Sequence, residues 1–110
     1  MKFRVIAKVE RINGYCPIYQ VGDKVVFEDF YLCSRESANI CLHALASMTS
    51  LLSPFLHGYS AVQLGIGRKE DTGYVQCPDP GQPHTQGGTV IFELSKEPIK
   101  VGFNKISRKI

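Results

Sequence analysis

The strongest constraint on the fold is a single run of apolar residues at helical spacing in the middle of the chain. Between residues 40 and 56, apolar side chains recur every three or four positions and so share one face of an α-helix. They are Ile40, Cys41, Ala44, Leu45, Met48, Leu51, Leu52, Phe55 and Leu56. We expect Ser34 or Ser37 to cap the start of this helix. Pro54 should kink or end it, and Gly58 is a natural stop.

The segments on both sides of the helix alternate apolar and polar residues, which is the period of a half-buried strand. This pattern predicts strands over residues 3–12, 24–30, 74–77 and 89–95, with a last one around 99–103. The order β-β-α-β-β-β with short links is typical of an α+β fold. We therefore predict one domain over residues 1–110, a mainly antiparallel sheet with one long amphipathic helix packed on a face.

The cysteines must be interpreted against the compartment in which the protein works. No window approaches 18 apolar residues, so we expect no membrane partner. The first 14 residues lack the apolar block of a signal peptide, which predicts a cytoplasmic location. Thiols stay reduced there, so four cysteines do not imply two disulfides. Metal binding, redox chemistry and plain burial are the competing explanations.

Three of the four cysteines occupy positions that could bring them together. Cys16 and Cys77 each precede a proline at the edge of a predicted strand, and a residue before proline is held extended. Cys41 begins the predicted helix, where the partial positive charge of the helix terminus favours a thiolate. With a fourth ligand, these three could hold zinc or an iron–sulfur cluster. No Cys-x-x-Cys pair is present, and burial alone remains the alternative because free cysteine is often a core residue.

Four further residues are candidate ligands: Cys33, His43, Asp79 and His84. His43 follows Cys41 by two positions, so within one helix their side chains diverge by roughly 200°. The two can share a metal only if the helix begins after Cys41. The alternative for His84 and Asp79 is a turn role, in which the Asp79 carboxylate accepts backbone N–H groups.

The stretch "CPDPGQPHTQGG", residues 77–88, holds two of these candidates and predicts a surface loop between two strands. Pro80 presets the backbone for the first central position of a turn, and Gly81 tolerates the positive φ of a type II turn. Gly87 and Gly88 provide a flexible return to the next strand.

Several of these motifs resemble a family of short prokaryotic proteins of about this length with no assigned activity. The matching features are Cys16-Pro17, Gly22-Asp23, "ICLHAL" at 40–45, "CPDP" at 77–80 and "VIFEL" at 90–94. The resemblance covers residues 3 to 95 and implies a prokaryotic, cytoplasmic origin.

Two functions from different classes follow from these observations. The first is a small cytosolic protein with a metal site, zinc or iron–sulfur, built from Cys16, Cys41 and Cys77. The second is a non-catalytic binding or structural module with buried cysteines, whose sheet edges pair between copies in a homo-oligomer. No catalytic motif accompanies either hypothesis, since the "GIG" at 65–67 lacks the context of a phosphate loop.

The end of the chain is basic. Residues 96–110 hold five basic side chains against Glu97 alone, and such a tail can neutralise phosphates. We interpret it instead as a solvated terminal strand and tail, and we do not expect a nucleic-acid partner.

Overall fold

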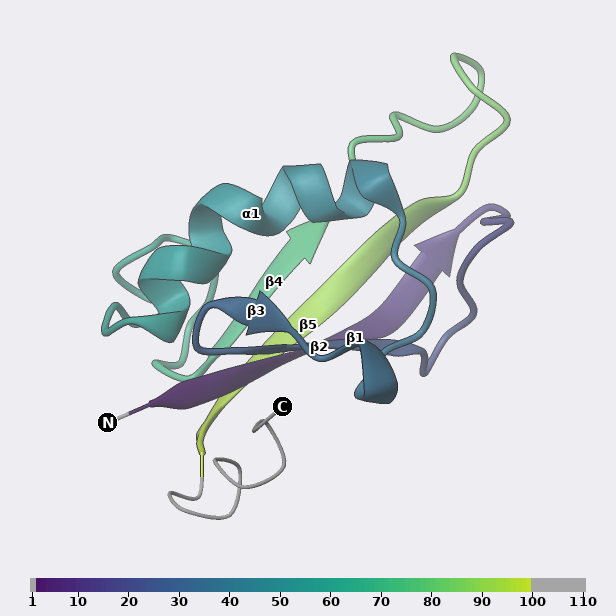
Figure 1. Cartoon of the computed structure of the whole chain (residues 1–110). Coiled ribbons are helices and arrows are strands. Elements are labelled where there is room, and N and C mark those ends of the chain that lie inside the picture. Colours follow the sequence, from purple (N-terminus) through teal and green to yellow (C-terminus); the bar gives the residue numbers. More distant parts are fainter. Residues whose placement is uncertain (1, 100–110) are drawn as a thin grey trace.

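Five strands form a single antiparallel sheet, and one α-helix lies across one of its faces (Figure 1). The computed structural model describes residues 2–99. The elements are β1 (Phe3–Asn13), β2 (Lys24–Glu28), β3 (Tyr31–Leu32), the short 3-10 helix η1 (Ser34–Glu36), α1 (Leu42–Leu56), β4 (Thr72–Gln76) and β5 (Thr89–Pro98). The strand order is β3-β2-β1-β5-β4, so the predicted α+β class is confirmed. No helix within the described part of the chain is long and apolar enough to cross a membrane.

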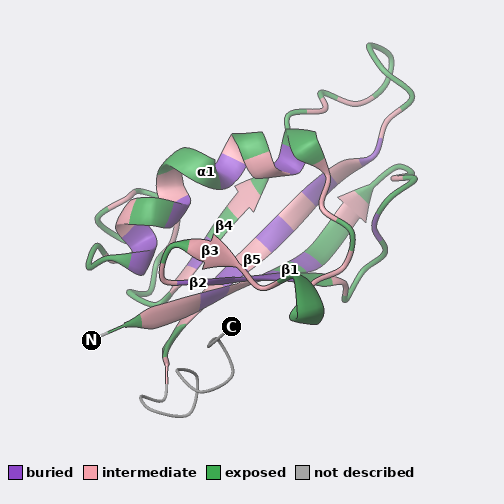
Figure 2. Ribbon diagram, in the orientation of Figure 1, coloured by how far each residue is buried: buried purple, intermediate pink, exposed green. Residues whose placement is uncertain are grey.

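The core lies between α1 and one face of the sheet (Figure 2). Alternate residues of the two central strands face the helix and are buried; they are Val5, Ala7 and Val9 on β1, and Val90, Phe92 and Leu94 on β5. From α1, the buried side chains are Ala44, Met48, Leu52, Phe55 and Leu56. The three-and-four spacing of the helix and the period of two in the strands therefore meet in one core.

The helix begins later than predicted, and neither Ser34 nor Ser37 caps it. Cys41 stands at the cap position with extended backbone angles, φ −73° and ψ 126°, and makes no side-chain capping bond. The Ser37 hydroxyl is already used, since it accepts the Val26 N–H at 2.8 Å and donates to the Cys33 carbonyl. Residues 33–38 thus run beside β2, and the helix forms only after they have left the sheet.

The helix also runs through Pro54, which lies in its last turn, and ends at Leu56. Of the two outcomes predicted at Pro54, a kink or an end, the end is wrong, because the helix continues for two more residues and a proline there removes only the bond to the carbonyl one turn back. The predicted stop at Gly58 is confirmed by its φ of +123°. His57 contributes a further cap through a 2.8 Å hydrogen bond between its Nδ1 and the Ser53 carbonyl.

Lys96, on β5, binds backbone carbonyls at the C-terminal end of α1. Its Nζ donates to the carbonyls of Phe55 and Tyr59 at 2.9 Å each. The same ammonium group lies over the rings of Phe55 and Phe3, 4.5 and 5.0 Å from their centroids. The interpretation of Lys96 as part of a solvated tail is therefore wrong. The strand expected around 99–103 and the rest of the tail lie outside the described residues, apart from Ile99, which follows β5.

Candidate functional site

Three segments that are distant in sequence meet at one end of the sheet: the loop after β1, the start of α1 and the loop between β4 and β5 (Figure 1). Two glycines lock the first loop to the third. Gly88 has φ +101°, and its N–H donates to the Asn13 carbonyl at 3.1 Å. A Cβ at Gly88 would lie 2.2 Å from the Tyr15 carbonyl oxygen, and one at Gly14 would lie 2.8 Å from the Gly88 nitrogen. Backbone contact this close requires glycine on both sides.

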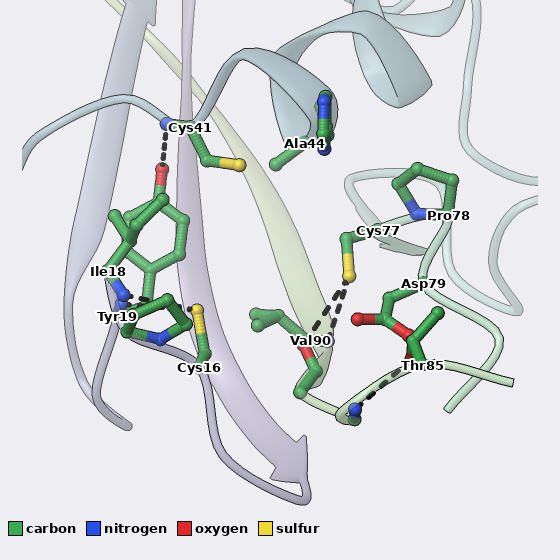
Figure 3. Close-up of a pocket in the computed structure, with 14 residues that line it drawn as sticks. Cys16, Ile18, Tyr19, Cys41, Ala44, Cys77, Pro78, Asp79, Thr85 and Val90 are labelled. Atoms are coloured by element: carbon green, nitrogen blue, oxygen red, sulfur yellow. Dashed lines mark hydrogen bonds between the residues drawn. The ribbon is translucent and has the colours of Figure 1, made fainter. Parts of the chain in front are cut away.

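These segments enclose a pocket of about 390 Å³ with mostly apolar walls. Its chemically distinctive lining residues are Cys16, Tyr19, Cys41, His43, Cys77 and Asp79. Figure 3 shows Cys16, Cys41 and Cys77 placed around it on three separate parts of the chain. The three cysteines predicted to lie together therefore line one pocket.

The Cys16 sulfur is the acceptor of two backbone N–H groups. Those of Ile18 and Tyr19 point at it from 3.4 and 3.3 Å (Figure 3). Pro17 begins the turn that carries these two amides back toward the side chain. A metal-bound or negatively charged sulfur accepts such bonds more strongly than a neutral thiol does, so the turn is preformed for an electron-rich sulfur.

Cys41 sits immediately before the first residue of α1. Its backbone N–H donates to the Tyr19 hydroxyl oxygen at 2.9 Å, and this bond ties the helix start to the loop after β1. Among the described residues, no hydrogen bond reaches its sulfur. Of the three pocket thiols, this one is the least engaged by the protein itself.

Cys77 is the most buried of the three, with 8% of its surface exposed. Its sulfur accepts the Val90 N–H at 3.2 Å, and its thiol donates to the Gly88 carbonyl at 3.7 Å. A thiol that both accepts and donates in this way is satisfied without a metal. Cys77 also belongs to the hydrophobic core, which favours a structural role.

The sulfurs of Cys16, Cys41 and Cys77 line the same pocket, but they do not all lie close to one another. Within residues 2–99, the only three ligand atoms of His, Cys, Asp or Glu that lie within 4.8 Å of one another belong to Glu28, Cys33 and Glu36. At least one pair of pocket sulfurs is therefore further apart than 4.8 Å. Zinc bound tetrahedrally at about 2.3 Å would hold its sulfurs only about 3.8 Å apart. Side-chain rotation would have to precede binding of a single ion.

His43 lies near the pocket thiols after all. The helix begins after Cys41, which is the condition under which the two residues can face one site, and both line the pocket. The His43 side chain is exposed at its mouth. His84 is not among the lining residues, and its N–H instead donates to the Gly81 carbonyl at 3.0 Å.

Asp79 lines the pocket, but its carboxylate is hydrogen-bonded within its own loop. Its Oδ1 accepts the Gly81 N–H at 2.8 Å and the Thr85 hydroxyl. The bond from Thr85, followed by that from Gly81, lowers the pKa of the Asp79 carboxyl. The turn role predicted for Asp79 is confirmed, as is the positive φ of Gly81, which is +83°.

Cys33 lies outside the pocket, directly after β3 and close to two carboxylates. Glu28 and Glu36 would offer a metal a partial site there, but the Arg4 guanidinium already occupies it, 3.3 and 2.7 Å from their oxygens. Burial, with the nearby charges of these two carboxylates, raises the pKa of Cys33 to about 11. The thiol is therefore neutral near pH 7, and the cluster is an ion-pair network.

Tyr19 is the pocket residue that sequence reasoning missed. It is 6% exposed and packs edge-on against Phe92, with ring centroids 5.6 Å apart. The available signal was an aromatic residue two positions after the Cys16-Pro17 pair, where the chain turns and carries it inward.

Comparison with known proteins adds no assignment. No protein-family model, no curated protein and no solved structure matches the chain. The resemblance to short prokaryotic proteins stays a prediction.

Proposed function

We propose that the protein is a small metal-binding protein whose centre is held by Cys16, Cys41 and Cys77. The observation that carries this proposal is the convergence of three free thiols, from three separate segments, on one pocket of about 390 Å³. Thiolates select zinc, copper(I) and iron–sulfur clusters over hard cations such as magnesium. The two amides aimed at the Cys16 sulfur are the kind of support that metal-bound thiolates receive.

An iron–sulfur cluster fits the spacing of the thiols better than one zinc ion. Cysteines that bind a cluster are attached to different iron atoms, so their sulfurs stand further apart than those around a single ion. At least one pair of pocket sulfurs exceeds 4.8 Å, and the pocket is larger than one ion needs. His43 is the best-placed fourth ligand, since it lines the same pocket and is not held by another residue in the described part of the chain.

The test is metal loading of wild type and of four single cysteine-to-alanine variants. Protein is purified without oxygen and analysed for iron, acid-labile sulfide and zinc, together with its visible absorption. We expect Cys16→Ala, Cys41→Ala and Cys77→Ala each to lower the bound metal. Cys33→Ala should keep it, because Cys33 lies outside the pocket and is the matched control. A colourless, metal-free wild type that reconstitution with iron and sulfide, or with zinc, also fails to load would overturn the proposal.

One observation favours the second candidate, a structural or binding module in which the cysteines are core. Cys77 is 8% exposed and is satisfied as both donor and acceptor. In this case Cys77→Ala lowers the free energy of unfolding, wild type binds no metal, and light scattering reports the state of association. The sheet edges give little support to pairing between copies, because β3 is two residues long and the Tyr74 N–H of β4 is bonded to the Ile66 carbonyl at 2.7 Å.

A further inference from the structure

One buried tyrosine connects two of the three pocket thiols. The backbone N–H of Tyr19 donates to the Cys16 sulfur at 3.3 Å, while the hydroxyl at the far end of its side chain accepts the Cys41 N–H at 2.9 Å (Figure 3). The ring between them is fixed by its edge-on contact with Phe92 and is 6% exposed. The side chain therefore acts as a rigid spacer between the loop after β1 and the start of α1.

The Tyr19 hydroxyl also has a hydrogen of its own to donate. Its oxygen accepts one bond, and no acceptor for its hydrogen is found among residues 2–99. A tyrosine hydroxyl is a hydrogen-bond donor as well as an acceptor, so this one has a hydrogen available. A protonated hydroxyl beside two thiols is a donor that a ligand sulfur can use.

We propose that Tyr19 is the positioning residue of the pocket: it sets the separation of Cys16 and Cys41, and its hydroxyl hydrogen is donated to a ligand sulfur when the centre is loaded. The second half of this statement rests on the proposed metal-binding function. The first half concerns the metal-free protein alone. Hydrogen bonds from such outer residues orient ligands and tune the affinity and the redox potential of a centre.

The experiment compares Tyr19→Phe with Tyr74→Phe. The first keeps the ring and its packing on Phe92 and removes only the hydroxyl. The second removes a hydroxyl from an exposed tyrosine on the edge strand β4, which donates to Glu93 and does not line the pocket, and it controls for loss of one such group. In metal-free protein, hydrogen exchange at the Cys41 amide and alkylation of Cys16 and Cys41 are followed residue by residue. In loaded protein, metal affinity and reduction potential are measured.

We expect Tyr19→Phe to raise exchange at the Cys41 amide about 10-fold, as loss of one hydrogen bond predicts, and to speed alkylation of both thiols. Metal affinity should fall about 10- to 100-fold, with a more negative reduction potential for a cluster. If wild type binds no metal but exchange and alkylation still rise, the metal-binding function is overturned while the spacer role of Tyr19 stands. If Tyr19→Phe matches Tyr74→Phe in metal-free protein, the spacer role is refuted. If affinity and potential are unchanged in loaded protein, the donated hydrogen bond is refuted.

Discussion

The close approach of Gly88 to Tyr15 predicts that Gly88→Ala damages both the fold and the pocket. The backbone at Gly88 has φ +101°, and an added Cβ would lie 2.2 Å from the Tyr15 oxygen, 2.9 Å from its carbonyl carbon and 3.3 Å from the Cys16 Cα. All three neighbours are backbone atoms, which cannot move aside by rotating a side chain. The loop must therefore shift away from the turn that carries Cys16.

Gly22 offers a matched control, because its φ is +97° and no atom lies within 4 Å of a Cβ built there. Gly22→Ala should show the backbone cost alone, about 1–2 kcal/mol for an L-residue in the left-handed region. Gly88→Ala carries the same cost, about 1–3 kcal/mol more for the forced displacement, and about 1 kcal/mol for the weakened bond between its N–H and the Asn13 carbonyl. We expect the total to be about 3–6 kcal/mol.

Urea unfolding of the three proteins measures these differences, provided that the slope of each transition is unchanged. Site-resolved alkylation at neutral pH provides the second measurement, since Cys77 loses cover when residue 88 moves. Equal loss of stability in Gly88→Ala and Gly22→Ala would show that the interlocked glycines do not hold the pocket together.

Three further predictions concern the core, the loop and the separate thiol. Leu94→Ala should cost about 2–5 kcal/mol in urea unfolding, because Leu94 is fully buried in the centre of the sheet, whereas an exposed leucine such as Leu42 should cost far less. The pKa of Asp79 is lowered in the folded state, so its contribution to stability is present above the unfolded pKa of about 3.9 and is lost as the pH falls below it. Asp79→Asn should show a weaker loss of stability with acid in that range, and an identical acid profile would contradict the role of the Thr85 and Gly81 bonds. Cys33, with a pKa of about 11, should be alkylated more slowly at pH 7 than an ordinary thiol, with the rate rising up to pH 11; rapid labelling at pH 7 would refute this.

The parts of the fold that depend on local pattern were predictable from the sequence. The three-and-four spacing of Met48, Leu52 and Phe55 identified the buried face of α1, and the Asp79 turn followed from the preference of aspartate for neighbouring amides. The start of the helix was not predictable in this way. Ser37 has the chemistry of a helix cap, but its hydroxyl is taken by the amide of Val26 in a strand that only the fold brings near.

The candidate site was likewise predictable only in part. Two Cys-Pro pairs and a cysteine at the start of the predicted helix indicated three thiols that share a site, and these three line one pocket. The separation of their sulfurs depends on the Val90 amide that holds Cys77 and on the Tyr19 hydroxyl that holds the Cys41 backbone. Both bonds are long-range contacts that no local pattern encodes. The position of Cys33 outside the pocket also depends on long-range contacts. Arg4 pairs with Glu36, a residue distant in sequence, beside Cys33.

The pairing of β1 with β5 has a consequence for synthesis on the ribosome. These strands form the centre of the sheet, with Phe3 opposite Pro98 and Asn13 opposite Thr89. A nascent chain therefore exposes one whole edge of β1 until β5 has left the exit tunnel, and the closing contact carries the entropy of a loop that contains most of the protein. The same event docks residue 88 against residue 15 and completes the pocket. The complete pocket therefore exists only after β5 has been translated, although Cys16, Cys41 and Cys77 all precede β5 in the chain.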